Sequence, residues 1–199
     1  FLLLFDAGAA YDPVEKIGLA RVTSDLLDEG TESRDGLQIQ RALDSFGASI
    51  TLSTGVDSGS IGMRALCETL DDAFEVFADL VRRPRFAEPD IERERGRLLA
   101  ELAYRDKQPN SMADEALDAM IFGATHPYGR PADGTVAGVE SVSRDDLFEF
   151  HRLRYRRENA RLLVVGAIDL GEVERLLDQH FPDWEDNGPA EQITPFTRP

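Results

Sequence analysis

Residues 18–31 read GLARVTSDLLDEGT, and the elements on either side of this stretch are best understood from it. Ala20, Ser24 and Leu27 recur at a spacing of three and four residues, which predicts an amphipathic helix. The helix should end at Gly30, a residue suited to a left-handed cap. Because its apolar stripe is narrow, the helix must pack against neighbouring elements to form a core.

The segment before this helix has the pattern of a buried strand. We expect this strand over Phe1–Ala7. Its apolar run Phe1–Phe5 is too short for a signal sequence or a membrane span, and it runs directly into Asp6. The chain opens inside this strand without an initiator Met, so we expect a piece of a longer protein that lacks any targeting segment. Localisation therefore stays undecided between a bacterial cytoplasm and periplasm.

The segments after the helix indicate an α+β protein. We expect helices over 35–46, 69–83, 88–106, 111–122, 143–155 and 170–181, hairpin strands over 49–55 and 58–66, a buried strand over 161–168, and a loop over 123–138. Asp35, Thr69 and Ser143 are the expected helix caps, and Leu37 is expected on an apolar side. From Pro182 the chain becomes polar, which predicts a domain over 1–184 and a linker over 185–199.

Composition excludes several classes of partner. The chain has 38 acidic and 22 basic side chains, and its formal charge of -16 repels nucleic acid and anionic lipid. Cys67 is the single cysteine, so an intrachain disulfide and a multi-cysteine zinc site are excluded. We expect this thiol to be inert in the core.

Several separated motifs resemble the insulinase/pitrilysin (M16) zinc metallopeptidases. Residues 18–31 match, without gaps, the active-site helix that in this family typically reads GLAHFLEHMLFKGT. Further matches are Ala7-Gly8-Ala9, residues 90–95 leading to 100–102, His126-Pro127-Tyr128-Gly129, and residues 143–147 ahead of Tyr155. The resemblance implies an antiparallel-dominated sheet with helices packed on one face, two such units per subunit, and a chamber that encloses an unfolded peptide.

The same resemblance implies a degenerate active site. In the family, two histidines and a distal glutamate bind zinc, and a glutamate in the motif H-x-x-E-H activates the metal-bound water. The matching positions here are Arg21, Ser24 and Asp25, with only the distal ligand retained as Glu101. A guanidinium has no lone pair to donate, and an isolated serine is not a base near neutral pH. The resemblance therefore implies a non-catalytic member that needs no cofactor.

We hypothesise that Arg21 supplies the positive charge that zinc supplies in active relatives, and that it pairs with Asp25, Glu101 or both. Glu101 as a solvated helix residue is the plain alternative. A calcium site that adds Asp28 is a second alternative, although the usual calcium-loop spacing is absent. A third alternative is a zinc site built from the scattered histidines His126, His151 and His180. We expect each of these three to have a packing or surface role instead.

Two further patterns receive structural interpretations. Gly55, Gly59 and Gly62 lie in strands, where they indicate close approach of backbones and not a phosphate-binding loop. The alternating charges over 92–97 indicate a solvated helix face laced with salt bridges.

The sequence thus favours a non-catalytic subunit that pairs with an active, zinc-bearing M16 chain, or with a second M16-like unit, and helps to form the peptide chamber. One alternative is a metal-dependent peptidase with an atypical site around Glu101. Another is a purely structural subunit like the family's core subunits of respiratory complexes. A peptide substrate follows from the resemblance, and no stretch of the chain predicts a membrane span.

Overall fold

A four-stranded antiparallel sheet organises the molecule. The computed structural model describes residues 1–182 and 184, so the expected linker over 185–199 lies outside the described residues. The strands are β1 (Leu2–Phe5), β2 (Ser49–Thr54), β3 (Gly59–Arg64) and β4 (Ala160–Leu163), in the spatial order β2-β3-β1-β4. Leu3 lies opposite Ile61 on one side and Leu162 on the other, so these side chains share a face of the sheet.

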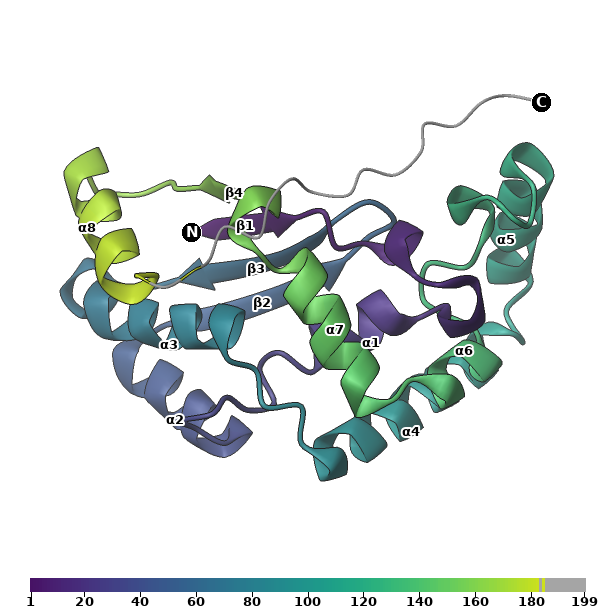
Figure 1. The fold of residues 1–199 in the computed structure, drawn as a ribbon, viewed down its shortest axis with the longest axis horizontal. Coiled ribbons are helices and arrows are strands. Elements are labelled where there is room, and N and C mark those ends of the chain that lie inside the picture. The colour runs from purple at the N-terminus through teal and green to yellow at the C-terminus, as the bar shows by residue number, and fades with distance from the viewer. Residues whose placement is uncertain (183, 185–199) are drawn as a thin grey trace.

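Helices cover that face of the sheet (Figure 1). They are α1 (Leu19–Asp25), α2 (Gly36–Phe46), α3 (Leu70–Arg82), α4 (Glu88–Arg105), α5 (Pro109–Phe122), α6 (Val136–Ser141), α7 (Arg144–Arg154) and α8 (Leu170–His180). Phe5 and Ile61 of the sheet share the main core with Phe74 and Phe77 of α3, and all four are fully buried. The predicted α+β fold with helices packed on one face is confirmed. Among the described residues, none of the helices combines the length and apolarity that a membrane crossing requires.

Local capping signals explain where several helices begin. The Asp35 carboxylate accepts a hydrogen bond from the Gln38 backbone N–H, and the Gln38 side chain accepts one from the Asp35 N–H, forming a capping box. Ser143 begins α7 in the same way. Thr69 stands at the predicted N-cap position of α3, but its side chain does not cap the helix. Its hydroxyl donates instead to the Phe46 carbonyl at 2.6 Å and ties the start of α3 to the end of α2.

Three predicted boundaries also need correction. The helix of residues 18–31 ends at Asp25, not at Gly30, because the chain then turns towards an isolated bridge between Thr31 and Pro84. The strand expected over 161–168 ends at Leu163, which lies opposite Leu2 at the end of the β1 pairing. Residues 164–168 have no strand beside them in the described part of the chain, and the expected loop over 123–138 contains the start of α6.

Some predicted environments are wrong as well. Leu37 is 60% exposed, because at 100° per residue it lies about 200° around α2 from Ile39, which packs with Leu43 against α3. Cys67 is exposed in a short 3-10 turn and is not a core thiol. Of the three strand glycines, only Gly59 lies in close contact, since a Cβ there would meet the Tyr155 hydroxyl at 3.1 Å.

Candidate functional site

Helix α1 is anchored at its N-terminus by a buried carboxylate. Asp12 is 4% exposed and accepts hydrogen bonds from the backbone N–H groups of Gly18 at 2.7 Å and Ala20 at 2.8 Å. These groups have no partner within the helix, so the carboxylate caps it. Burial raises the pKa of Asp12 to about 7, against the opposing effect of the two N–H groups. Gly18 has a φ of 114°, which favours glycine at this turn.

Arg21 lies on the outer side of α1 and meets carboxylates from three segments. Its Nε is 2.5 Å from Asp25 Oδ2 on the same helix, and its Nη1 is 3.2 Å from Asp133 Oδ1 in the loop before α6. Its Nη2 is 3.6 Å from Glu101 Oε2 on α4. Burial disfavours the charged guanidinium, but the hydrogen bond to Asp25 and the surrounding negative charges raise the pKa of Arg21 above its ordinary value. The guanidinium is therefore fixed in its charged form.

A second arginine, Arg97 of α4, joins the same cluster. Its Nη2 is 2.9 Å from Asp25 Oδ2 and its Nη1 is 3.3 Å from Glu101 Oε2. It also makes a two-pronged contact with Glu94, which is only 5% exposed. Hydrogen bonding to Glu94 raises the pKa of Arg97. Arg21 and Arg97 therefore hold Asp25 between them.

We call this cluster the Arg21 network, consisting of Arg21, Asp25, Glu94, Arg97, Glu101 and Asp133. The sequence interpretation of residues 92–97 as a solvated face is wrong for Glu94 and incomplete for Arg97. No signal in the sequence identified Asp133, which lies 112 residues from its partner Arg21. Burial raises the pKa of Asp25, while Arg21 and Arg97 act against that shift and Glu94 adds to it.

Ser24, at the position of the family's catalytic glutamate, points away from this network. It is 1% exposed, and its hydroxyl lies beside that of Tyr155 on the inner side of α1. Burial raises the pKa of Tyr155, against the opposing influence of Ser24. Neither hydroxyl makes a hydrogen bond of good geometry with any described residue. Ser24 is therefore a buried packing residue with no base to activate it.

The residues present do not fit the zinc ion that the resemblance implies for active relatives. Arg21 has no lone pair and Ser24 faces the interior, which leaves Asp25 and Glu101, both already paired with arginines. Asp28 is exposed on the turn after α1. No group of three or more His, Cys, Asp or Glu side chains that could hold a metal ion lies among residues 1–182 and 184. These residues therefore give no support to the calcium alternative.

The three histidines lie away from the Arg21 network. His126 stacks on Phe122 next to α5. His151 is partly buried, its ring is hydrogen-bonded to the Val81 carbonyl, and desolvation lowers its pKa to about 4. His180 contacts Asp71 at 2.8 Å.

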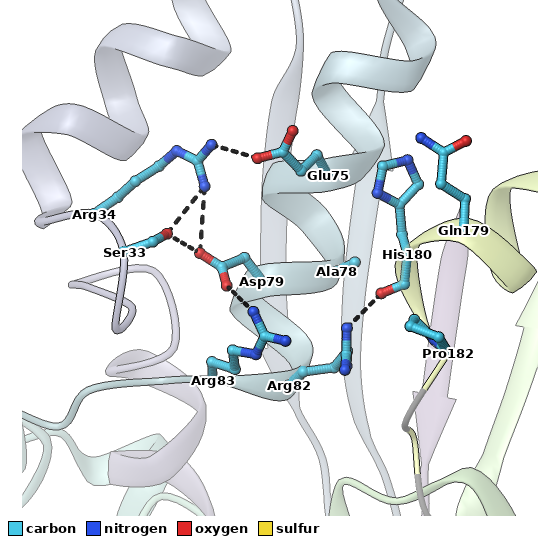
Figure 2. A pocket seen from close by; sticks show the side chains of 10 residues that line it. All are labelled: Ser33, Arg34, Glu75, Ala78, Asp79, Arg82, Arg83, Gln179, His180 and Pro182. Carbon is cyan, nitrogen blue, oxygen red and sulfur yellow. Dashed lines mark hydrogen bonds and ion pairs between the residues drawn. The ribbon is translucent and has the colours of Figure 1, made fainter.

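A separate pocket of about 340 Å³ lies between α3, the turn before α2 and the end of α8 (Figure 2). It shares no residue with the Arg21 network. Arg34 pairs with Glu75 at 2.6 Å and with Asp79 at 3.3 Å, and Arg82 donates to the His180 carbonyl at 2.7 Å. Arg34 and Arg82 thus join α3 to the turn before α2 and to the end of α8.

Comparison with known proteins places this geometry in a family. Residues 1–134 match the family profile described as Insulinase (Peptidase family M16). The chain belongs to the M16 peptidase family. Residues 141–199 match a profile described as Peptidase M16 inactive domain. That second segment contains neither α1 nor Glu101, so its description does not decide the chemistry at the Arg21 network.

Individual relatives agree with this assignment. An uncharacterized zinc protease of Mycobacterium leprae (strain TN) is 33% identical over 164 residues, which are 82% of this chain and 37% of that protein. Mitochondrial-processing peptidase subunit beta of Homo sapiens is 26% identical over 181 residues, 91% of this chain and 37% of that protein. The crystal structure of a peptidase M16 inactive domain from Pseudomonas fluorescens superposes with a TM-score of 0.90 at 26% identity, covering 96% of this chain and 46% of that chain. The chain thus spans less than half the length of these relatives.

Proposed function

We propose that this chain is a non-catalytic M16 unit that pairs with a zinc-bearing chain of the same family and forms part of the wall of its peptide chamber. The observation that carries the proposal is the position of Arg21, whose guanidinium contacts Asp25, Glu101 and Asp133 where active relatives would hold a metal ion. A permanently charged group there satisfies the carboxylates and blocks the ligand position at once.

The Arg21 network explains how the fold keeps its shape without zinc. In an active relative, the metal would join α1 to α4. Here Arg21 reaches from α1 to Glu101, and Arg97 reaches back from α4 to Asp25 at 2.9 Å. Two charge-assisted contacts in opposite directions replace one metal bridge. The surface is thereby preserved while the hydrolytic machinery is absent.

Two further observations support the pairing and the peptide. A relative of this chain, mitochondrial-processing peptidase subunit beta, is by name one subunit of a larger enzyme. Strand β2 lies at the edge of the sheet in the order β2-β3-β1-β4, and alternate residues along it are exposed. An edge strand with unpaired backbone groups is suited to the addition of an extended peptide. We therefore assign the peptide contact to the edge of the sheet that β2 forms.

The test uses the full-length protein and a zinc-bearing M16 chain from the same organism. Metal content after incubation with zinc and desalting should be below about a tenth of an equivalent, because the ligand set is lost. Hydrolysis of an unfolded fluorogenic peptide should be absent for this chain alone and present for the mixture. Light scattering after gel filtration should show a complex of the two chains.

Two outcomes would contradict this proposal. Uptake of about one equivalent of zinc that is abolished by Glu101→Ala would support a metal-dependent peptidase with an atypical site. A mixture that elutes as two separate chains, with hydrolysis unchanged from the zinc-bearing chain alone, would remove the pairing role.

A further inference from the structure

Helix α5 turns its apolar side towards solvent. None of its residues is buried, and three of its large apolar side chains, Leu117, Met120 and Ile121, are 54%, 84% and 56% exposed. At the usual 100° per residue they form one arc of about 140° with two alanines. We call this surface the α5 stripe, and it consists of Ala113, Ala116, Leu117, Met120 and Ile121. A stripe of this width normally faces a protein core.

The polar side of α5 fixes this orientation. Glu115 forms an ion pair with Arg105 at 3.1 Å, and Asp114 and Asp118 line a pocket of about 220 Å³ between α5 and the loop that contains Asp133. At the C-terminal end, the Phe122 ring packs edge-on against Tyr128. Glu115 and Phe122 thus hold one side of α5 against the body of the molecule, Asp114 and Asp118 lie exposed beside the pocket, and the α5 stripe faces outward.

The helix also stands next to the Arg21 network. Arg105, which holds α5 through Glu115, contacts Asp133 at 3.2 Å, and Asp133 contacts Arg21 at the same distance. In Figure 1, α5 lies at one end of the long axis, opposite α8. A molecule that covers the network therefore meets α5 at its rim.

We propose that the α5 stripe is the surface by which this chain docks onto its zinc-bearing M16 partner, which presents an apolar groove with a basic rim. This inference rests on the proposed pairing function and adds the surface that performs it. Leu117, Met120 and Ile121 lie at the i, i+3 and i+4 positions by which a helix anchors in a groove. The flexible thioether of Met120 adapts to such a surface.

Charge distinguishes the partner from a second copy of this chain. Helix α5 carries Asp114, Glu115 and Asp118 and no basic residue, and Asp114 and Asp118 are exposed. Two copies docked through α5 would bring these like charges together on a chain whose formal charge is -16. A basic rim on the partner would complement them and would accelerate association at low salt.

The test compares variants of the full-length protein for binding to the zinc-bearing chain. Leu117→Asp combined with Met120→Asp should lower the affinity at least about tenfold, because it places charges in the apolar contact. The thermal midpoint of the isolated protein should not change, because both side chains are exposed. The control is Leu37→Asp, a single leucine-to-aspartate change at the 60% exposed Leu37 of α2, which should leave the affinity unchanged.

A second measurement addresses the rim. Asp114→Lys with Asp118→Lys should reduce the association rate and weaken its dependence on salt, while the dissociation rate changes little. Rates that are identical to those of the wild type would overturn the basic rim.

The remaining outcomes also decide the matter. Wild-type binding with no effect of the double aspartate variant overturns the α5 surface but leaves the pairing function intact. Failure of the wild type to bind overturns both. A wild-type homodimer that the variant converts to a monomer assigns α5 to a second copy. A lowered thermal midpoint of the isolated double aspartate variant assigns the α5 stripe to the rest of the same polypeptide. Either result overturns the proposed occupant.

Discussion

Arg21 Nε lies 2.5 Å from Asp25 Oδ2, one helical turn further along α1. Arg97 Nη2 reaches the same oxygen from α4 at 2.9 Å. Two guanidinium groups therefore share one carboxylate at the place where the M16 resemblance puts a metal ligand. This arrangement couples α1 and α4 through charge and makes both arginines part of the stability of the site.

Loss of Arg21 should destabilise the fold. Arg21→Ala leaves Asp25 with one cation and removes the contacts to Glu101 and Asp133, so we expect the free energy of unfolding to fall by about 1–3 kcal/mol. Urea unfolding at low salt measures this change. Arg152→Ala is the control, because Arg152 makes an exposed pair with Glu149 within one helix and should change stability little. Equal effects of the two variants would show that the Arg21 network contributes nothing special.

Restoration of the zinc motif should require a fourth change. The variant Arg21→His, Ser24→Glu, Asp25→His rebuilds the ligands but leaves the Arg97 guanidinium 3.3 Å from Glu101 Oε2. A fixed cation beside a ligand opposes metal binding, so this variant should bind zinc substoichiometrically. The addition of Arg97→Ala should raise the metal content towards one equivalent, as measured by mass spectrometry after desalting.

The quadruple variant should still hydrolyse peptides poorly, because positioning of the substrate by the rest of the chamber contributes much of the rate. The same metal content in the triple and quadruple variants would show that Arg97 does not oppose the metal. No zinc in either variant would mean that the surrounding second shell has changed as well.

The sequence identifies those features that depend on neighbours within one turn. The Asp35 and Ser143 caps and the buried side of α3 each follow from residues three or four apart. The Arg21 network could be predicted only in part, because Asp133 and Arg97 come from distant segments. The charge pattern around Arg97 on α4 is the same as that of a solvated helix face. Only the packing of α4 on α1 shows that Arg97 takes part in the network.

The orientation of α5 likewise cannot be predicted from its own residues. Its apolar residues have the spacing of a buried stripe, and a sequence carries no mark of which side of a helix faces the body. The contact between Arg105 and Glu115 decides the orientation, and it joins two different helices.

Asp12 should make the protein less stable as the pH rises through neutrality. Its pKa is about 7 in the folded protein, against an ordinary value of 3.8. The folded state therefore binds more protons between these values. Its contribution to stability is complete below about pH 4 and is lost as the pH rises through 7. Asp12→Asn removes this titration, so its free energy of unfolding should depend less on pH over the same interval, by about 1 kcal/mol or more.

The comparison must be made between variant and wild type, because His151 acts in the opposite direction. Its pKa is lowered to about 4 in the folded protein, so its contribution to stability is lost as the pH falls from about 6.5 to 4. The difference between the two urea-unfolding profiles cancels this term and isolates Asp12. Parallel profiles from pH 4 to 8 would contradict the assignment.

Two helical glycines should respond in opposite ways to the same substitution. Gly138 lies in α6, where an added Cβ would approach the Ile17 carbonyl oxygen to 2.2 Å. Since backbone atoms cannot move aside cheaply, Gly138→Ala should lower the free energy of unfolding by about 1–3 kcal/mol and loosen the contact of α6 with the start of α1.

Gly96 lies in α4 with nothing within 4 Å of the same Cβ position. There the alanine only restricts the unfolded chain and improves helix propensity, so Gly96→Ala should stabilise the protein by about 0.5–1 kcal/mol. Thermal and urea unfolding of the two variants side by side would measure both signs, and a stabilised Gly138→Ala variant would show that the loop before α6 can move away from Ile17.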